Sequence, residues 1–211
     1  MKNIDKLGRI ILASKSPRRI EILKKIDLNF EVMPSDIVED FDRTSPSAFV
    51  QICAYEKAKK ISLMNRNNFV IGADTIVTLD KRIMEKPRDI KEGRQMLGLL
   101  SGKTHKVFTG VSIQNFNKDI NESFYSTTEV ELNSISDNII DYYISNYEPY
   151  DKAGSYGIQD WFSSQIKNIN GCYYNVMGLP LSKVFKCLYD ISMNNFKDWL
   201  IKIFQKYDWI L

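Results

Sequence analysis

The sequence predicts an α/β protein built on a mixed β-sheet with flanking helices. Short apolar runs alternate with segments whose apolar residues recur at helical spacing. The run Phe69–Leu79 is almost continuously apolar, as in a strand buried on both faces. Lys106–Phe116 and Glu122–Leu132 alternate on either side of an Asn-Lys-Asp turn, which predicts an antiparallel hairpin with long arms. The 211 residues suffice for one such unit, divided into two lobes by a cleft.

Local signals place the elements of the first half of the chain. A helix is expected to begin at Pro17, because Ser16 is a favoured N-cap residue and apolar residues follow at 20, 23 and 26. Ser45-Pro46 repeats this start for a longer helix. In chain order we expect a strand at Arg9–Ala13, a helix at Pro17–Ile26, a strand at Phe30–Met33, a helix from Pro46 to about Leu63, the Phe69–Leu79 strand and a hairpin turn at Asp80-Lys81.

The second half continues the alternation. After the long hairpin, Glu148–Asp160 is expected as a glycine-containing loop. The tail Asn195–Leu211 has apolar residues at spacings of 3, 1, 3, 4 and 3, which predicts an amphipathic helix. We therefore divide the chain into a domain over residues 1–194 and a helical extension over 195–211. The other expected elements are a helix at Asp89–Leu100, a helix at Ser136–Asn146, a strand at Ser163–Ile169 and a helix at Leu181–Tyr189.

Composition excludes several classes of protein. The three cysteines are widely spaced, so neither a disulfide framework nor a zinc ribbon is expected. With one histidine, any metal should be a hard cation, Mg²⁺ or Mn²⁺, held by carboxylates and phosphates. A formal charge of +3 is too small to indicate a nucleic-acid binder. No signal-peptide core is present and no run approaches the roughly 18 apolar residues of a membrane span, so we expect a soluble cytoplasmic protein without membrane insertion.

Two cations stand where a helix disfavours them. Arg18 and Arg19 lie in the first turn of the predicted helix, where the helix dipole favours anions. A bound phosphate would reverse the sign, since free backbone N–H groups, two guanidiniums and the hydroxyls of Ser14 and Ser16 would converge on it. A solvated basic corner or a Ser-Pro modification site are the alternatives, and the sequence leaves the choice open.

A carboxylate stands in the middle of the most apolar strand. Asp74 follows Gly72-Ala73, which are small enough for a ligand to approach closely. A buried carboxylate is costly unless it is paired or binds a metal, so we favour a general base or a metal ligand over a cap of the following turn.

Three further polar positions are less decisive. Lys57 shares a helical stripe with apolar residues, and snorkelling to solvent is the expected outcome of that spacing. Lys86 is expected in an exposed turn. Gln159 ends a dense polar loop and could read the edge of a nucleobase or merely face solvent. His105 is expected as a polar residue at a strand end rather than as a catalyst.

Five ordered motifs resemble those of Maf proteins, the septum-formation-associated nucleoside triphosphate pyrophosphatases. Together they cover about residues 10–189, and their common order makes the resemblance specific. They are Ser14-x-Ser16-Pro17-Arg18-Arg19, Gly72-Ala73-Asp74-Thr75, Leu100-Ser101-Gly102-x-x-His105, Glu148-Pro149-x-Asp151-Lys152-Ala153-Gly154-x-Tyr156-Gly157-Ile158-Gln159 and Asn175-Val176-x-Gly178-Leu179-Pro180.

The resemblance implies a hydrolase that cleaves a nucleoside triphosphate between the α- and β-phosphates with a divalent cation. It implies an elongated mixed sheet with two lobes around a cleft, similar to the inosine-triphosphatase group. Asp74 matches the family's proton acceptor, and Glu39 falls at an acidic position that helps to hold metal. The implied substrate-selecting residues are Arg18, Thr75 and Gln159, and the implied phosphate-binding residues are Ser14, Ser16, Arg19, Lys57 and Lys86.

Gln159 resembles the family branch that prefers dTTP and UTP. Two alternatives stay open: the branch acting on 7-methyl-GTP, and a regulator of septum formation that binds nucleotide with little hydrolysis. House-cleaning of nucleotide pools and arrest of cell division are the implied roles. The tail helix could dock on its own domain, on the mate in a homodimer or on a membrane surface.

Overall fold

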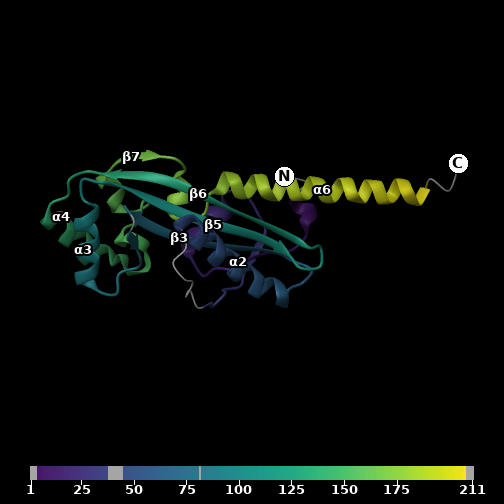
Figure 1. The fold of residues 1–211 in the computed structure, drawn as a ribbon, viewed down its shortest axis with the longest axis horizontal. Coiled ribbons are helices and arrows are strands. Elements are labelled where there is room, and N and C mark those ends of the chain that lie inside the picture. The colour runs from purple at the N-terminus through teal and green to yellow at the C-terminus, as the bar shows by residue number, and fades with distance from the viewer. Residues whose placement is uncertain (1–3, 38–44, 81, 208–211) are drawn as a thin grey trace.

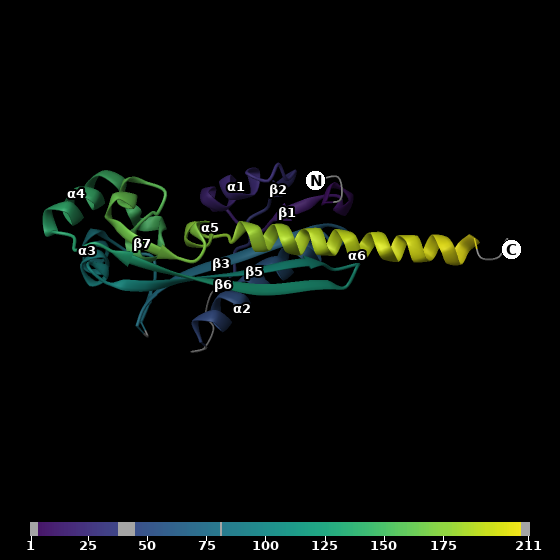
Figure 2. The same cartoon turned by 90° about the horizontal axis from the view of Figure 1, so that it is seen from above.

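The computed structural model describes residues 4–37, 45–80 and 82–207, and within them seven strands form one mixed sheet (Figures 1 and 2). The strand order is β2-β1-β3-β5-β6-β7, and β4 pairs with β3 beside this path. β1 is parallel to β2 and β3, whereas the other neighbours are antiparallel, so the predicted mixed α/β class is confirmed. The strands are β1 (Ile10–Leu12), β2 (Phe30–Val32), β3 (Phe69–Leu79), β4 (Arg82–Met84), β5 (Thr104–Asn115), β6 (Ile120–Leu132) and β7 (Ile166–Asn170).

The helices begin where the sequence predicts. Ser16, Ser45 and Asp89 act as N-caps, and the side chain of each accepts a hydrogen bond from the backbone N–H three residues later. Proline occupies the first turn after both serines. The helices are α1 (Pro17–Lys24), α2 (Pro46–Met64), α3 (Ile90–Leu100), α4 (Asp137–Tyr147), α5 (Tyr173–Met177) and α6 (Leu181–Tyr207), with 3₁₀ turns η1 (Ile4–Leu7), η2 (Pro149–Asp151), η3 (Ala153–Ser155) and η4 (Trp161–Gln165).

Three parts of the prediction were wrong. The strand expected at Ser163–Ile169 begins only at Ile166, because Asp160 accepts a hydrogen bond from the Phe162 N–H and so starts the η4 turn. The short helix α5 was not expected. Helix α6 does not stop at Tyr189 but continues to Tyr207, projecting beyond the end of the sheet (Figures 1 and 2). No helix in the described part of the chain has both the length and the apolar composition needed to cross a bilayer.

Helix α2 lies directly on one face of β3 and β5. A methyl group at Gly72 would collide with the Ala54 carbonyl, and one at Gly110 would collide with the Val50 carbonyl. The glycines therefore allow the helix backbone to rest on the strands. Gly72 makes room for a helix, which corrects the expectation that it makes room for a ligand.

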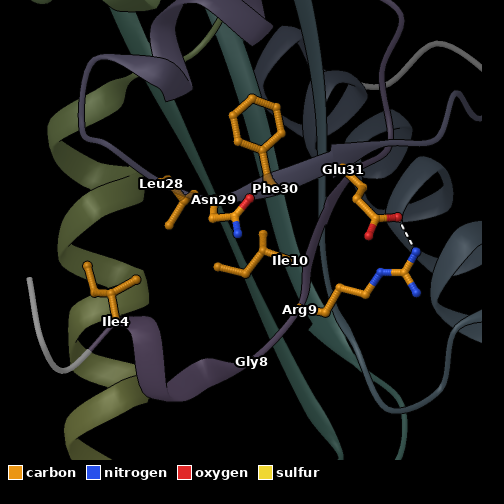
Figure 3. A pocket seen from close by; sticks show the side chains of 8 residues that line it. All are labelled: Ile4, Gly8, Arg9, Ile10, Leu28, Asn29, Phe30 and Glu31. Carbon is orange, nitrogen blue, oxygen red and sulfur yellow. Dashed lines mark hydrogen bonds and ion pairs between the residues drawn. The ribbon is translucent and has the colours of Figure 1, made fainter.

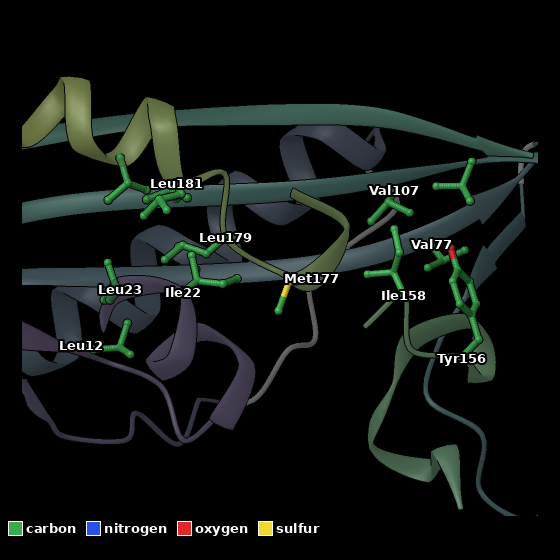
Figure 4. Close-up of a cluster of buried hydrophobic side chains, with 14 of the residues drawn as sticks. Leu12, Ile22, Leu23, Val77, Val107, Tyr156, Ile158, Met177, Leu179 and Leu181 are labelled. Atoms are coloured by element: carbon green, nitrogen blue, oxygen red, sulfur yellow. The ribbon is translucent and has the colours of Figure 1, made fainter. Parts of the chain in front are cut away.

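The larger hydrophobic core lies on the opposite face of the sheet. Leu12, Ile22 and Leu23 pack there with Met177 and Leu179, which lie at the end of α5 and between α5 and α6 (Figure 4). Helices α3 and α4 pack against each other near one end of the long strands, and α1 lies nearer the other end (Figure 2). The polar turns η2 and η3 connect α4 to the middle of the molecule, beside β3 and α3.

Candidate active site

One edge of β3 lacks a strand partner in its middle. Pairing with β1 ends at Ile71, whose carbonyl accepts a last hydrogen bond of 2.8 Å from the Ala13 N–H. Pairing with β4 begins only at Val77. Among the described strands, none pairs with residues 72–76 along this edge. Asp74 and Thr75 lie in this interval, so they are next to backbone that a ligand can approach.

Asp74 points toward helix α2 and is nearly buried, with 7% of its surface exposed. The Lys57 ammonium of α2 donates a hydrogen bond of 2.7 Å to Asp74 Oδ1. The two side chains are only 12% and 9% exposed, so this ion pair is largely removed from solvent. The expectation that Lys57 snorkels to solvent was wrong, because a carboxylate faces the stripe of α2 on which it lies.

Thr75 points toward the opposite face of β3, where Arg19 contacts it. Arg19 Nη2 donates to Thr75 Oγ1 over 3.0 Å, Nη1 donates to Ser14 Oγ over 3.2 Å, and Nε donates to the Gly178 carbonyl over 2.8 Å. Ser14 Oγ also accepts from the Ser16 N–H, so the turn before α1 is closed upon itself. Arg19 thus joins α1, β3 and the end of α5, a structural use of its guanidinium that the sequence did not suggest.

Arg18 contacts a different partner. Its Nη1 donates a hydrogen bond of 2.7 Å to Asp151 Oδ2, and its Nη2 donates to the Asp151 carbonyl over 3.3 Å. Lys152 Nζ donates to the other carboxylate oxygen over 2.7 Å. Burial by itself would raise the pKa of Asp151, but the hydrogen bonds from Lys152 and Arg18 outweigh it and lower that pKa. Sequence reasoning did not name Asp151 and Lys152 as site residues, although their adjacent opposite charges were visible in the loop.

The remaining predicted site residues are less gathered. Lys86 is exposed beyond β4, and the carbonyl of the preceding Glu85 accepts a hydrogen bond of 3.2 Å from the Gly154 N–H. This contact brings the loop after η2 next to Lys86. Gln159 is exposed in the same polar segment. Glu39 lies outside the described residues.

Two further features lie away from the open edge of β3. His105 is the second residue of β5, so it lies at a strand end as expected, but it is only 1% exposed, and its Nε2 lies 2.7 Å from the Tyr156 hydroxyl. Burial lowers the pKa of His105 to about 4. A cavity of about 480 Å³ lies beside β1 and β2, and none of the predicted site residues lines it (Figure 3). The lining residues are Ile4, Gly8, Arg9, Ile10, Leu28, Asn29, Phe30 and Glu31.

The fold and the site define a mixed α/β protein that presents a lysine-paired carboxylate, a threonine hydroxyl and the Arg19 guanidinium along the open edge of one strand. Residues 9–191 match the family described as Maf-like protein, so the chain belongs to the Maf family, as its motifs indicated. It is 46% identical over 185 residues to a dTTP/UTP pyrophosphatase of Thermosipho africanus, covering 88% of this chain and 94% of that one. It is 44% identical over 191 residues to a dTTP/UTP pyrophosphatase of Bacillus pumilus, covering 90% and 100%.

Among solved structures, the Staphylococcus aureus Ham1 protein matches 59% of this chain and 72% of its own with a TM-score of 0.42 and 16% identity.

Proposed function

We propose that this protein hydrolyses dTTP and UTP to the nucleoside monophosphate and pyrophosphate. Relatives that match about nine tenths of the chain carry the name of this activity. The observation that carries the proposal is the Lys57–Asp74 pair at the unpaired edge of β3, since it supplies a carboxylate where a ligand can reach the strand. We place the reaction in the cytoplasm, where these substrates are made and used.

In the proposed reaction Asp74 acts on water. Lys57 holds Oδ1, which fixes the carboxylate plane and leaves the second oxygen to orient a water molecule and accept its proton. The water attacks the α-phosphorus, the bond from that phosphorus to the oxygen bridging the α- and β-phosphates breaks, and pyrophosphate leaves with the electron pair. No covalent intermediate on the protein is required.

Cations around the edge would receive the phosphates. A triphosphate carries about four negative charges, and fixed positive groups lower the energy of the charge that develops on the leaving group. We assign this role to Arg18 and to the exposed Lys86, and Lys152 lies beside Arg18 on Asp151. Arg19 would act mainly through the Ser14–Ser16 turn, whose geometry it fixes.

We propose that a divalent cation of the hard class takes part, although the described residues include no cluster of three or more His, Cys, Asp or Glu side chains that would hold it alone. Mg²⁺ and Mn²⁺ prefer oxygen ligands, and Mg²⁺ often binds one or two protein carboxylates together with substrate phosphates. Asp74 can supply one such carboxylate, and Glu39 is proposed as a second. The cation, when bound, would neutralise phosphate charge.

Substrate choice is proposed to rest on Arg18, Thr75 and Gln159. The exposed amide of Gln159 can donate and accept hydrogen bonds at once, as the edge of a uracil or thymine ring requires. We assign these functions to residues 1–194. Residues 195–207 are the outer part of the continuous helix α6, and residues 208–211 lie outside the described part of the chain.

Product analysis tests the proposal directly. Purified protein with Mg²⁺ or Mn²⁺ is expected to convert UTP to UMP and pyrophosphate, and dTTP likewise, measured by anion-exchange chromatography and ³¹P NMR. Saturable binding of UTP without product would instead support a nucleotide-binding regulator. Faster turnover of 7-methyl-GTP than of UTP would instead assign the protein to the family branch that acts on 7-methyl-GTP.

Asp74→Asn tests the role of the carboxylate. It should abolish turnover while UTP binding, measured by calorimetry, stays within a few fold of wild type. The matched control is Asp119→Asn in the exposed hairpin turn, where φ is 53° and asparagine is tolerated as well as aspartate. Wild-type turnover in Asp74→Asn would remove Asp74 from the mechanism.

A further inference from the structure

A chain of hydrogen bonds runs through the sheet beneath Thr75. Thr75 on β3 and Thr109 on β5 are directly opposite each other, and their hydroxyl oxygens lie 3.0 Å apart. Thr109 Oγ1 donates a hydrogen bond of 2.9 Å to the Asn175 carbonyl of α5. Both Thr109 and Asn175 are fully buried. The chain therefore links α5 through two strands to Arg19 of α1.

Counting hydrogens fixes the direction of every bond in this chain. A carbonyl can only accept, so the single hydroxyl hydrogen of Thr109 is committed to Asn175. The 3.0 Å contact with Thr75 then requires Thr75 to donate to Thr109, and the Gly178 carbonyl, 3.4 Å from Thr75 Oγ1, is a second and more distant acceptor for the same hydrogen. Thr75 has no hydrogen left, and it accepts from Arg19 Nη2. The Thr75 hydroxyl can thus offer a ligand only a lone pair.

Asn175 makes the far end of the chain rigid. Its Nδ2 donates to the Val107 carbonyl over 3.0 Å and to Thr128 Oγ1 over 2.9 Å, so β5 and β6 both hold it. Gly178, three residues later, presents its carbonyl to Arg19 Nε. The last turn of α5 therefore holds Arg19 in two ways. Gly178 accepts from it directly, and Asn175 is linked to it through Thr109 and Thr75.

We propose that Thr109 is a positioning residue, which acts on substrate recognition by fixing the hydroxyl rotor of Thr75 and, through it, the guanidinium of Arg19. This inference rests on the proposed function and adds to it a residue that the family motifs did not name. Thr109 does not contact Asp74, because Asp74 faces α2 on the other side of β3. Thr109 should therefore influence nucleotide affinity much more than the attack of water.

Replacing Thr109 with valine tests this assignment, since valine keeps the shape and removes the hydroxyl. The Asn175 carbonyl still accepts from the Gly178 N–H over 3.0 Å, so the variant leaves no buried acceptor orphaned. We expect the KM for UTP and for dTTP to rise about three- to tenfold, the effect of losing one ordered hydrogen bond, with kcat unchanged within twofold. Thr109→Ser, which retains the hydroxyl, should restore the wild-type KM.

A double variant shows whether the effect passes through Thr75. If it does, adding Thr109→Val to Thr75→Val changes KM no further. If the two residues act independently, the double variant's rise in KM is the product of the rises in the single variants. A fall in kcat equal to the rise in KM, failure of serine to rescue, or multiplicative effects would each overturn the inference. Should Thr109→Val not fold, Thr109→Ala is judged by the same KM criterion. Wild-type protein that forms no UMP would instead refute the proposed function itself.

Discussion

Replacing Lys57 with methionine would leave the Asp74 carboxylate buried without its cation. Methionine matches the lysine stem in length, so packing against α2 changes little and the charge is the main loss. The pair is short, at 2.7 Å, and its side chains are 12% and 9% exposed, so solvent cannot replace the ammonium. Breaking a buried pair by removing one partner typically costs about 3–5 kcal/mol, and we expect Lys57→Met to lose this much free energy of unfolding.

Urea unfolding of a double-mutant cycle measures this loss. Asp74→Asn alone should destabilise the wild type, because the ammonium of Lys57 would lose its counter-charge. In the Lys57→Met background the same change should stabilise, because it removes the orphaned charge. The expected signature is therefore a change of sign in the effect of Asp74→Asn between the two backgrounds.

Lys186 provides the matched control for this experiment. It forms an ion pair of 2.6 Å with Asp190 on α6, but the side chains of Lys186 and Asp190 are 75% and 53% exposed. Lys186→Met should leave the urea midpoint close to wild type, since exposed pairs contribute little. If Lys57→Met loses less than about 1 kcal/mol, or if Asp74→Asn has the same sign in both backgrounds, the pair is solvated and the reasoning from burial is refuted.

Three further predictions follow from other parts of the molecule. Gly72→Ala should lose about 1–3 kcal/mol of unfolding free energy because its methyl meets the backbone of α2, whereas Gly98→Ala, in an exposed helix position with open space, should gain about 0.5–1 kcal/mol. The pKa of His105 is lowered to about 4, so between about pH 6.5 and pH 4 this histidine is protonated in the unfolded chain but neutral in the folded chain. Stability should fall by about 3 kcal/mol between pH 6.5 and 4, and pH-dependent urea unfolding should lack this component in His105→Gln. Truncation after Asn194 should retain UTP turnover, and light scattering and liposome sedimentation of both forms would show what residues 195–211 bind; loss of turnover would contradict the division at 194.

The elements that the sequence predicted well are those set by neighbouring residues. A serine or aspartate cap acts on an N–H three residues away, so the starts of α1, α2 and α3 could be placed from short segments. β3 is buried on both faces, and its apolar run has the bounds of the strand itself. α5 spans only five residues, too few for a helical period to show. The sequence predicted helix up to Tyr189 and again from Asn195, but not that residues 190–194 join the two into the single helix α6.

The site residues were recognisable one at a time, but their partners were not. Lys57 and Asp74 are 17 residues apart, Arg19 and Thr75 are 56 apart, and Arg18 and Asp151 are 133 apart. The first two pairs form only when a helix is placed against the sheet, and the third forms only when α1 meets the η2 turn. Gly72 and Gly110 explain why Lys57 does not reach solvent. They let α2 lie close to the face of the sheet that carries Asp74, so Lys57 meets that carboxylate.

Adjacent residues on one strand can serve two different tasks because a strand points successive side chains to opposite faces. Asp74 meets α2 and its lysine, whereas Thr75 meets the α1 and α5 side and its arginine. A ligand could touch both only by reaching around the strand's edge, and a neighbouring strand would prevent this. The interval between the last β1 pairing at Ile71 and the first β4 pairing at Val77 leaves that edge open. Under the proposed function, the same interval lets water chemistry come from one face of β3 and substrate recognition from the other.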